Sequence, residues 1–375
     1  MALQQFPVIS VQGKPFDCGQ QHGSQAREQI RKNIDTYFDL WQQMWGTNRP
    51  EVLQQCKGFI TAIGEYDADI LEEMEGIAKG ADLSLEEIIA LNTRYELTRI
   101  ELTRIQNPTS QAESGGCTSM AALPQVTRDG HTILGQNWDY KAMFYATDII
   151  LEVKQETSPN LITHTEAGTI AHDGMNSAGV GVCFNALSSN LHSLEPGTPF
   201  LVMLRGVLNA NSFDQALAAV LDTRATVAGN ILIAHRDGEA IDLEAIPDDV
   251  ACLYPDSGII THSNHFLGFT NRSDFKDIGK SSAPNTLFRA NRAWQLLELD
   301  RGHIDISSFQ QVFKDHFSHP NSICRHADVR KTRPEQVATL ASVVIDMTEQ
   351  TFYVTKGAPC QNEYYKLQSQ CLLED

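Results

Sequence analysis

The sequence predicts an α+β protein in which stacked sheets lie between outer layers of helices. Two observations predict this class. Residues 1 to about 112 show mainly helical periodicity, whereas the chain after Cys117 changes to short apolar runs typical of strands. Those runs bracket a pair of helical segments, 198–210 and 212–222. The one sharp change of composition lies at Gly116, which indicates either a domain boundary or a processing site.

Three stretches justify the helical part. The first is 19–45, where apolar residues recur at helical spacing: Ile30, Ile34, Phe38, Leu40 and Trp41. A second helix, 66–80, ends at a glycine break, and the next begins after the cap-like run 84–87. The tandem repeat of ELTRI at 96–105 is expected to make the helix there slightly longer. A polar loop, 107–116, then leads to the strand region.

Alternating apolar residues and tight-turn signals justify the strands. Two strands are expected around an Asp129–Gly130 turn, and 148–155 with 160–168 form a further pair. A single strand is expected over 179–187. Hairpins are expected over 230–246, around its Asp-Gly turn, and over 339–357. Of the two central helices, the second is expected to start at a capping serine, Ser212.

Composition narrows the class of protein. The chain of 375 residues is 42% hydrophobic and 20% charged, as in ordinary globular proteins, and has no apolar run long enough to span a bilayer. Neither end resembles a targeting signal, so a cytoplasmic location is the default expectation. A formal net charge of −18 argues against nucleic-acid or anionic-membrane partners.

The eight cysteines contain no C-x-x-C pair, which argues against a zinc or thioredoxin-like motif and predicts mostly buried free thiols. One cysteine stands apart. In ESGGCTSMAALP, 113–124, Cys117 directly follows two glycines at the expected start of a strand. The glycines would let the backbone adopt a strained conformation and let the thiol approach the preceding carbonyl.

A nucleophilic thiol needs a base, because its reference pKa is about 8.5. The nearest histidine in sequence, His131, sits beside the expected turn. A second base appears if the bond between Gly116 and Cys117 is cut. The new α-amino group would have a pKa of about 7.7–8.0 and would lie on the same residue as the nucleophile. The hydroxyls of Thr118 and Ser119 lie near the same point.

Six motifs in order resemble the penicillin acyltransferase-like family of N-terminal nucleophile hydrolases. They are CGQQHGSQAR near the start, GCTSMAALP at the cysteine, LGQNWDY, TEAGTIAHDGMNSAGVGVCFNAL, THSNHF and NSICRH. The resemblance implies a four-layered αββα sandwich. It also implies a precursor that cuts itself between Gly116 and Cys117. The helical chain 1–116 and the catalytic chain 117–375 would then stay associated as a heterodimer.

The resemblance also implies roles for individual residues. Cys117 corresponds to the nucleophile, Asp139 in QNWD to the carboxylate that orients the new amino group, and Ser119 to a hydroxyl that assists self-cleavage. Asn264 in HSNH corresponds to the donor that stabilises the oxyanion, a role that suits an amide N–H. The neighbour of Asp139, Tyr140, is expected to contact substrate.

Arg325 in SICRH resembles the active-site arginine of the family, and we expect it to bind a carboxylate of the substrate; holding Asp139 in place is the competing role. A structural alternative stays open for each of these residues. Cys117 could be a buried thiol and Asp139 a turn cap. Asn264 could be a loop residue that binds backbone groups, and Arg325 a surface ion-pair partner. His262 and His265 lie three apart and form a conceivable metal pair, but no third ligand accompanies them, so no metal is expected.

The expected reaction is attack on an amide or thioester carbonyl, with a thioester on Cys117 as intermediate. An amidohydrolase or acyltransferase acting on a small N-acyl compound is favoured, with hydrolysis preferred and no cofactor. The alternative is an acyl-coenzyme A-dependent N-acyltransferase of the penicillin-biosynthesis type, in which the coenzyme A thioester donates the acyl group. A metal-dependent hydrolase and a non-catalytic binding protein of the same fold are further alternatives.

Overall fold

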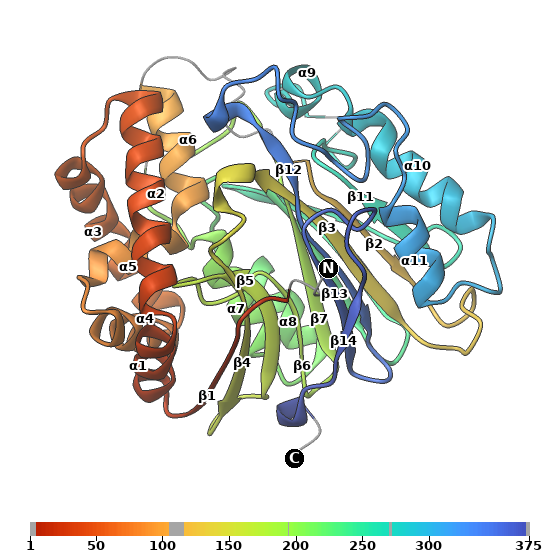
Figure 1. Ribbon diagram of the computed structural model, residues 1–375, viewed down its shortest axis with the longest axis horizontal. Helices are drawn as coiled ribbons and strands as arrows, with labels where there is room; N and C mark the ends of the chain where they lie inside the picture. The colour runs from red at the N-terminus through yellow and green to blue at the C-terminus, as the bar shows by residue number, and fades with distance from the viewer. Residues whose placement is uncertain (1–4, 105–115, 194, 270–271, 373–375) are drawn as a thin grey trace.

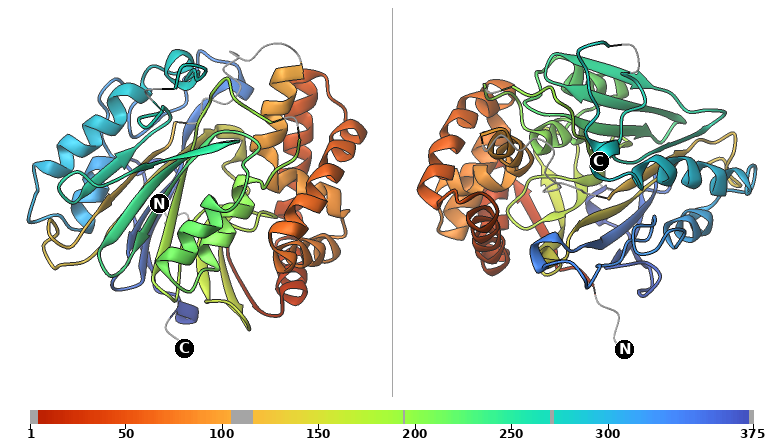
Figure 2. Two further views of the ribbon diagram at one scale, coloured as in Figure 1. Left: turned by 180° about the vertical axis from the view of Figure 1, so that it is seen from behind. Right: turned by 90° about the horizontal axis from the view of Figure 1, so that it is seen from above.

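Four layers make up the structure, a computed structural model that describes residues 5–104, 116–193, 195–269 and 272–372. Two sheets lie face to face, with helices against both outer sides (Figure 1 and, from above, Figure 2). The predicted αββα sandwich is therefore confirmed. Most of the hydrophobic core lies between the sheets and under the N-terminal helices, and a second cluster lies under the C-terminal helices.

The first sheet has eight strands. In spatial order they are β1 (Val8–Gly13), β4 (Asp148–Gln155), β5 (Leu161–Glu166), β6 (Asp173–Asn176), β7 (Val180–Ala186), β8 (Gly229–His235), β9 (Glu239–Ile246) and β10 (Asp249–Leu253). All neighbours are antiparallel except β1 and β4, which pair in parallel. The N-terminal segment, expected to be mainly helical, thus also supplies an edge strand to this sheet.

The second sheet has six antiparallel strands. In spatial order they are β11 (Ile259–His262), β2 (Thr118–Ala122), β3 (Ile133–Lys141), β12 (Val337–Asp346), β13 (Thr351–Lys356) and β14 (Tyr365–Leu367). The predicted hairpins β8–β9 and β12–β13 are confirmed, as is the pair β4–β5. Between β2 and β3 the predicted tight turn is wrong, because Asp129–Gly130 lies inside a longer connection.

The helices form the two outer layers. Beside the eight-stranded sheet lie α1 (Pro15–Gln25), α2 (Arg27–Trp45), α3 (Arg49–Tyr66), α4 (Ala68–Ala81), α5 (Leu85–Asn92), α6 (Arg94–Arg104), α7 (Phe200–Leu208) and α8 (Phe213–Leu221). Against the six-stranded sheet lie α10 (Thr286–Glu298) and α11 (Ile306–Phe313), preceded by the short α9 (Gly279–Ser282). None of the helices in the described ranges combines the length and apolar character needed to cross a bilayer.

Helix ends follow the expected capping chemistry in part. Ser84 and Glu87 form a reciprocal capping box at the start of α5, as predicted. Ser212 occupies the position before α8, but its hydroxyl donates to the Asp214 carboxylate and caps no helix N–H. Residues 107–115 of the expected polar loop lie outside the described residues. Ile105, the last residue of the ELTRI repeat, lies outside them as well.

Residues before and after Cys117 are interleaved through the core. Strand β1, before Cys117, pairs with β4, after it. Two buried ion pairs also join these two parts of the chain: Arg94 with Glu166 at 2.5 Å, and Arg205 with Glu73 at 2.5 Å. Because breaking a buried pair leaves an uncompensated charge, each such pair strongly disfavours separation. A cut at the Gly116–Cys117 bond would therefore leave the two pieces packed as one body.

Candidate active site

Cys117 lies directly before β2, between the two sheets, and is 5% exposed. Pairing of Thr118 with Asn137 places the start of β2 beside the middle of β3, two residues before Asp139. The Cys117 Sγ consequently lies 3.7 Å from the backbone oxygen of Asp139, and the Gly116 N–H donates to the same oxygen at 3.4 Å. The register of two strands thus brings together the predicted nucleophile and the predicted carboxylate residue.

Gly116 is required by close packing and not by a strained backbone. Its φ is not in the left-handed region, so the expected strain is absent at this residue. A Cβ at this position would instead lie 2.5 Å from the guanidinium carbon of Arg325. The absence of a side chain lets this guanidinium lie directly against the backbone of the predicted cleavage site.

Replacing Gly116 by alanine should therefore cost about 1–3 kcal/mol of folding stability, the usual cost of overpacking, and should slow any self-cleavage. The stability change is measured by denaturant unfolding of the uncut Cys117→Ala chain, so that processing does not interfere. In an Arg325→Ala background most of the cost should disappear, since the clashing group is gone. An equal cost in both backgrounds would show that Arg325 is not what excludes a side chain.

Arg289, on α10, contacts the predicted scissile peptide more closely than any residue singled out from sequence. Its Nη1 donates to the carbonyl oxygen of Gly116, to that of Cys117 at 2.7 Å and to the Thr118 hydroxyl at 2.9 Å. Its Nη2 donates to Asn264 Oδ1 at 2.8 Å. A fully buried cation is thus aimed at the carbonyl where negative charge would develop during attack by the thiol.

Arg289 is not among the residues predicted from the sequence, although its position in α10 is distinctive. The buried residues of α10 are Thr286, Arg289, Ala290, Ala293 and Leu297, which follow one helical stripe. An arginine inside an otherwise uncharged stripe is unusual, because a buried charge needs dedicated partners.

Asp139 and Arg325 form the second half of the site. Arg325 Nε lies 3.7 Å from Asp139 Oδ2, and the Thr339 hydroxyl donates to Asp139 Oδ1 at 2.5 Å. Arg325 Nη2 donates to Asn285 Oδ1 at 2.7 Å. Burial raises the pKa of Asp139 to about 7, although Arg325, Arg289 and the Thr339 hydroxyl all oppose the rise. This carboxyl group can therefore both hold and release a proton near neutral pH.

In the uncut chain the thiol of Cys117 is protonated at neutral pH. Burial raises its pKa to about 12, and the negative charge of Asp139 adds to the rise. His131 is no base for it, because its Nδ1 pairs with Asp346 at 2.9 Å. Asp346 pairs with Ile133 at the opposite end of β3 from Asp139. His131 therefore cannot activate the thiol, and the other base expected from the sequence, an α-amino group on Cys117, does not exist in the uncut chain.

The remaining predicted residues lie around this group. The Asn264 side chain is held between Arg289 and the Ala186 carbonyl, to which its Nδ2 donates at 2.9 Å. Its role as an oxyanion donor stays a prediction, since that N–H has a partner in the uncut chain. Ser119 projects between the sheets and donates to Asn185 Oδ1 at 2.6 Å. Its role in self-cleavage also stays a prediction.

His262 and His265 do not converge as a metal pair would. Both nitrogens of His262 are engaged with oxygen atoms, of Glu244 and of the Ser263 backbone, each at 2.9 Å. The Nδ1 of His265 lies 3.1 Å from the Thr286 hydroxyl. These contacts show that both rings help to hold the loop that carries Asn264.

A pocket beside Cys117 is lined mainly by apolar and aromatic side chains. The lining comes from both sides of the predicted cleavage point: Leu40, Trp41, Met44, Trp45, Tyr95 and Thr98 before it, and Trp138, Asp139, Tyr140, Lys141 and Ala186 after it. Trp138 and Tyr140 stack with ring centroids 5.5 Å apart. The predicted substrate residue Tyr140 therefore borders the pocket, although its contact with a substrate stays a prediction.

A sequence model of the acyl-coenzyme A:6-aminopenicillanic acid acyl-transferase family matches residues 126–361, a range that holds Asp139, Asn264, Arg289 and Arg325. The chain belongs to this family. It is 30% identical over 353 residues to the 40 kDa form of acyl-coenzyme A:6-aminopenicillanic-acid acyltransferase of Emericella nidulans, covering 94% of this chain and 92% of that one. The chain is thus an enzyme of an acyl-transferring family, as the motifs predicted.

Solved structures are more distant. A mutant of the conjugated bile acid hydrolase of Clostridium perfringens is 16% identical, with a TM-score of 0.46 over 68% of this chain and 97% of that one. Penicillin V acylase of Agrobacterium tumefaciens is 13% identical, with a TM-score of 0.42 over 64% of this chain and 83% of that one.

Proposed function

We propose that the chain cuts itself between Gly116 and Cys117 and then uses Cys117 to move the acyl group of a small N-acyl amide or thioester to water or to an amine. One observation carries this proposal. The peptide carbonyl before the cysteine already has an arginine donor on its oxygen, and the thiol lies against the backbone oxygen of Asp139, whose own carboxyl group has a pKa of about 7.

Self-cleavage would begin with the Cys117 thiol passing its proton to Asp139. The sulfur adds to the Gly116 carbonyl carbon while Arg289 stabilises the oxyanion. Breaking the C–N bond transfers residues 1–116 to the sulfur as a thioester, and the departing nitrogen takes the proton. Water then hydrolyses the thioester, which leaves a carboxylate on Gly116 and a free thiol and amine on Cys117.

Substrate turnover would repeat this chemistry at the same position. The new α-amino group takes the thiol proton, the sulfur attacks the substrate carbonyl, and the protonated leaving amine departs. Water or an acceptor amine then resolves the acyl thioester. We assign the oxyanion contacts to Arg289 and Asn264, because Arg289 binds both Asn264 and the Gly116 carbonyl oxygen. Hydrolysis is our first choice, and transfer from a coenzyme A thioester is the alternative.

Of the two roles open for Arg325, we assign it to positioning Asp139. The guanidinium is 3% exposed and lies against the backbone of Gly116. Its Nη2 is bound to Asn285 and its Nε faces the Asp139 carboxylate. A carboxylate oriented in this way would hold the α-ammonium group of Cys117, which in the uncut chain is still a peptide N–H.

The aromatic lining of the pocket indicates the kind of acyl group. Flat rings from Trp41, Trp138 and Tyr140 next to the thiol favour an apolar or aromatic acyl chain over a charged one. Because α2 supplies part of that lining, both products of the cut would build the substrate site together. We therefore propose that the active enzyme is a heterodimer of residues 1–116 and 117–375.

The proposed function is tested by trapping the acyl-enzyme. Purified enzyme is mixed with N-acyl amides and acyl thioesters, quenched in acid within milliseconds, and analysed by intact mass. We expect the mass of the 117–375 chain to rise by one acyl group, most with apolar acyl chains, and alkylating the Cys117 thiol first should abolish the adduct. Turnover that continues unchanged after alkylation would contradict the thioester mechanism.

A further inference from the structure

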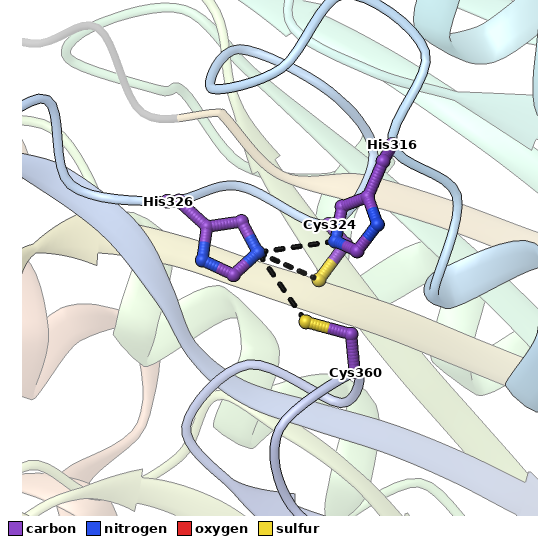
Figure 3. A group of neighbouring side chains, drawn as sticks. All are labelled: His316, Cys324, His326 and Cys360. Carbon is purple, nitrogen blue, oxygen red and sulfur yellow. Dashed lines mark hydrogen bonds between the residues drawn. The ribbon is translucent and has the colours of Figure 1, made fainter.

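Four potential metal ligands meet at the surface of the six-stranded sheet, away from the pocket at Cys117. His316, Cys324 and His326 belong to the connection between α11 and β12, and Cys360 belongs to the connection between β13 and β14. Their ligand atoms all lie within 4.8 Å of one another. Figure 3 shows the two rings and the two sulfur atoms turned toward a common centre.

The three separations from His326 Nε2 are close to those that a tetrahedral zinc ion imposes, and the other three ligand-atom separations are at most 4.8 Å. With Zn–N of about 2.0–2.1 Å and Zn–S of about 2.3 Å, tetrahedral ligands lie about 3.3 Å apart for two nitrogens and about 3.5 Å for nitrogen and sulfur. The Nε2 atoms of His316 and His326 are 3.1 Å apart. The Nε2 of His326 lies 3.7 Å from Cys324 Sγ and 3.3 Å from Cys360 Sγ.

Hydrogen bonding alone does not explain this arrangement. A neutral imidazole nitrogen offers one direction, either a single N–H or a single lone pair. The Nε2 of His326 nevertheless faces three polar atoms at once, as the three dashed lines in Figure 3 show. A metal ion at the common centre would engage one lone pair from each of the four atoms.

Charge also fits a divalent ion. Two thiolates would balance the charge of Zn²⁺, so a partly buried site would carry no net charge. Two imidazoles with two thiolates form one of the usual donor sets of structural zinc.

We propose that His316, Cys324, His326 and Cys360 bind one Zn²⁺ ion in a closed tetrahedral site. With all four positions filled by protein atoms, the ion has no open position for a substrate, so its role is structural. It would tie the connection that carries Arg325, which stands between two of the ligands, to the end of the β13–β14 hairpin. The metal site itself does not depend on the proposed function, whereas this effect on Arg325 does.

Cysteine spacing did not reveal the site. The absence of C-x-x-C pairs argues against a zinc motif only for ligands that are close together in the sequence. Here the pair is C-x-H, at Cys324 and His326, with His316 ten residues before His326 and Cys360 34 residues after it. Only the folding of β12 and β13 into a hairpin brings the last ligand to the others.

Elemental analysis of the purified full-length chain tests the proposal. We expect one zinc per chain, lost in Cys324→Ser and in Cys360→Ser. Cys252→Ser and His319→Ala serve as matched controls: the first removes an exposed cysteine elsewhere, and the second a ring 5.0 Å from His326 that is outside the ligand set. Both controls should keep the metal. Loss of zinc in His319→Ala but not in His316→Ala would overturn the assigned ligands.

A second measurement covers variants that fail to fold. Wild-type chain stripped with a chelator and titrated with Co²⁺ should bind one equivalent and develop the intense visible absorption of tetrahedral cobalt with thiolate ligands. Stripping should also lower the melting temperature reversibly. A stripped chain that binds no Co²⁺, or wild-type protein that contains a Cys324–Cys360 disulfide and no metal, would overturn the proposal. Because metal content needs no substrate, this result is independent of the acyl-transfer reaction.

Discussion

Cys117→Ala should leave one uncut chain of 375 residues, whereas wild-type protein should appear as two chains, the longer beginning at Cys117. The reason is that the substitution removes the sulfur that must attack the Gly116 carbonyl, and no other thiol or hydroxyl can take both its place and its α-amino base. Intact mass and N-terminal sequencing measure the outcome. Acyl transfer should fall to the background rate, because the same atom carries the acyl group.

A matched control separates this loss from general damage. Cys56 on α3 is also a buried free thiol, and Cys56→Ala should remain cut and active. Under native conditions the two wild-type products should elute together, because β1 pairs with β4 and buried ion pairs cross the cut. An uncut wild-type chain with full activity would disprove the N-terminal nucleophile mechanism.

Arg289→Gln should slow self-cleavage by about 10²–10³-fold, the usual effect of removing an oxyanion donor. A glutamine is shorter and uncharged, so it cannot keep the charge-assisted bond to the Gly116 carbonyl oxygen. The measurement follows the appearance of the two chains after a pulse of cell-free synthesis. The processed fraction should also lose turnover more than substrate affinity, because the donor acts chiefly in the transition state.

Arg292→Gln provides the comparison from the same helix. Arg292 lies three residues further along α10, pairs with Asp315 and contacts neither Gly116 nor Cys117. The Arg292→Gln variant should cut itself at nearly the wild-type rate. Its free energy of unfolding should fall only slightly, as expected when a partly exposed ion pair is lost. If both arginine variants were cut equally fast, Arg289 would be a packing residue and the oxyanion role would fall to Asn264 alone.

The sequence by itself determined the layered fold and the family. Periodicity separated a helical N-terminal part from a strand-rich remainder, because apolar spacing follows secondary structure directly. The glycine pair before Cys117 and the motifs around Asp139, Asn264 and Arg325 pointed to one acyl-transfer site. These signals are local, since each depends on neighbouring residues or on a short motif read along the chain.

Only the tertiary structure decided which groups face the Gly116 carbonyl and which four residues meet at the proposed metal site. Arg289 reaches Gly116 across 173 positions, a contact that no local pattern encodes. The need for glycine at 116 arises from Arg325 lying against it, and not from a turn that the glycine itself makes. Cys360 joins His316, Cys324 and His326 only through a hairpin. Such groupings depend on strand register and helix packing, which many distant residues determine together.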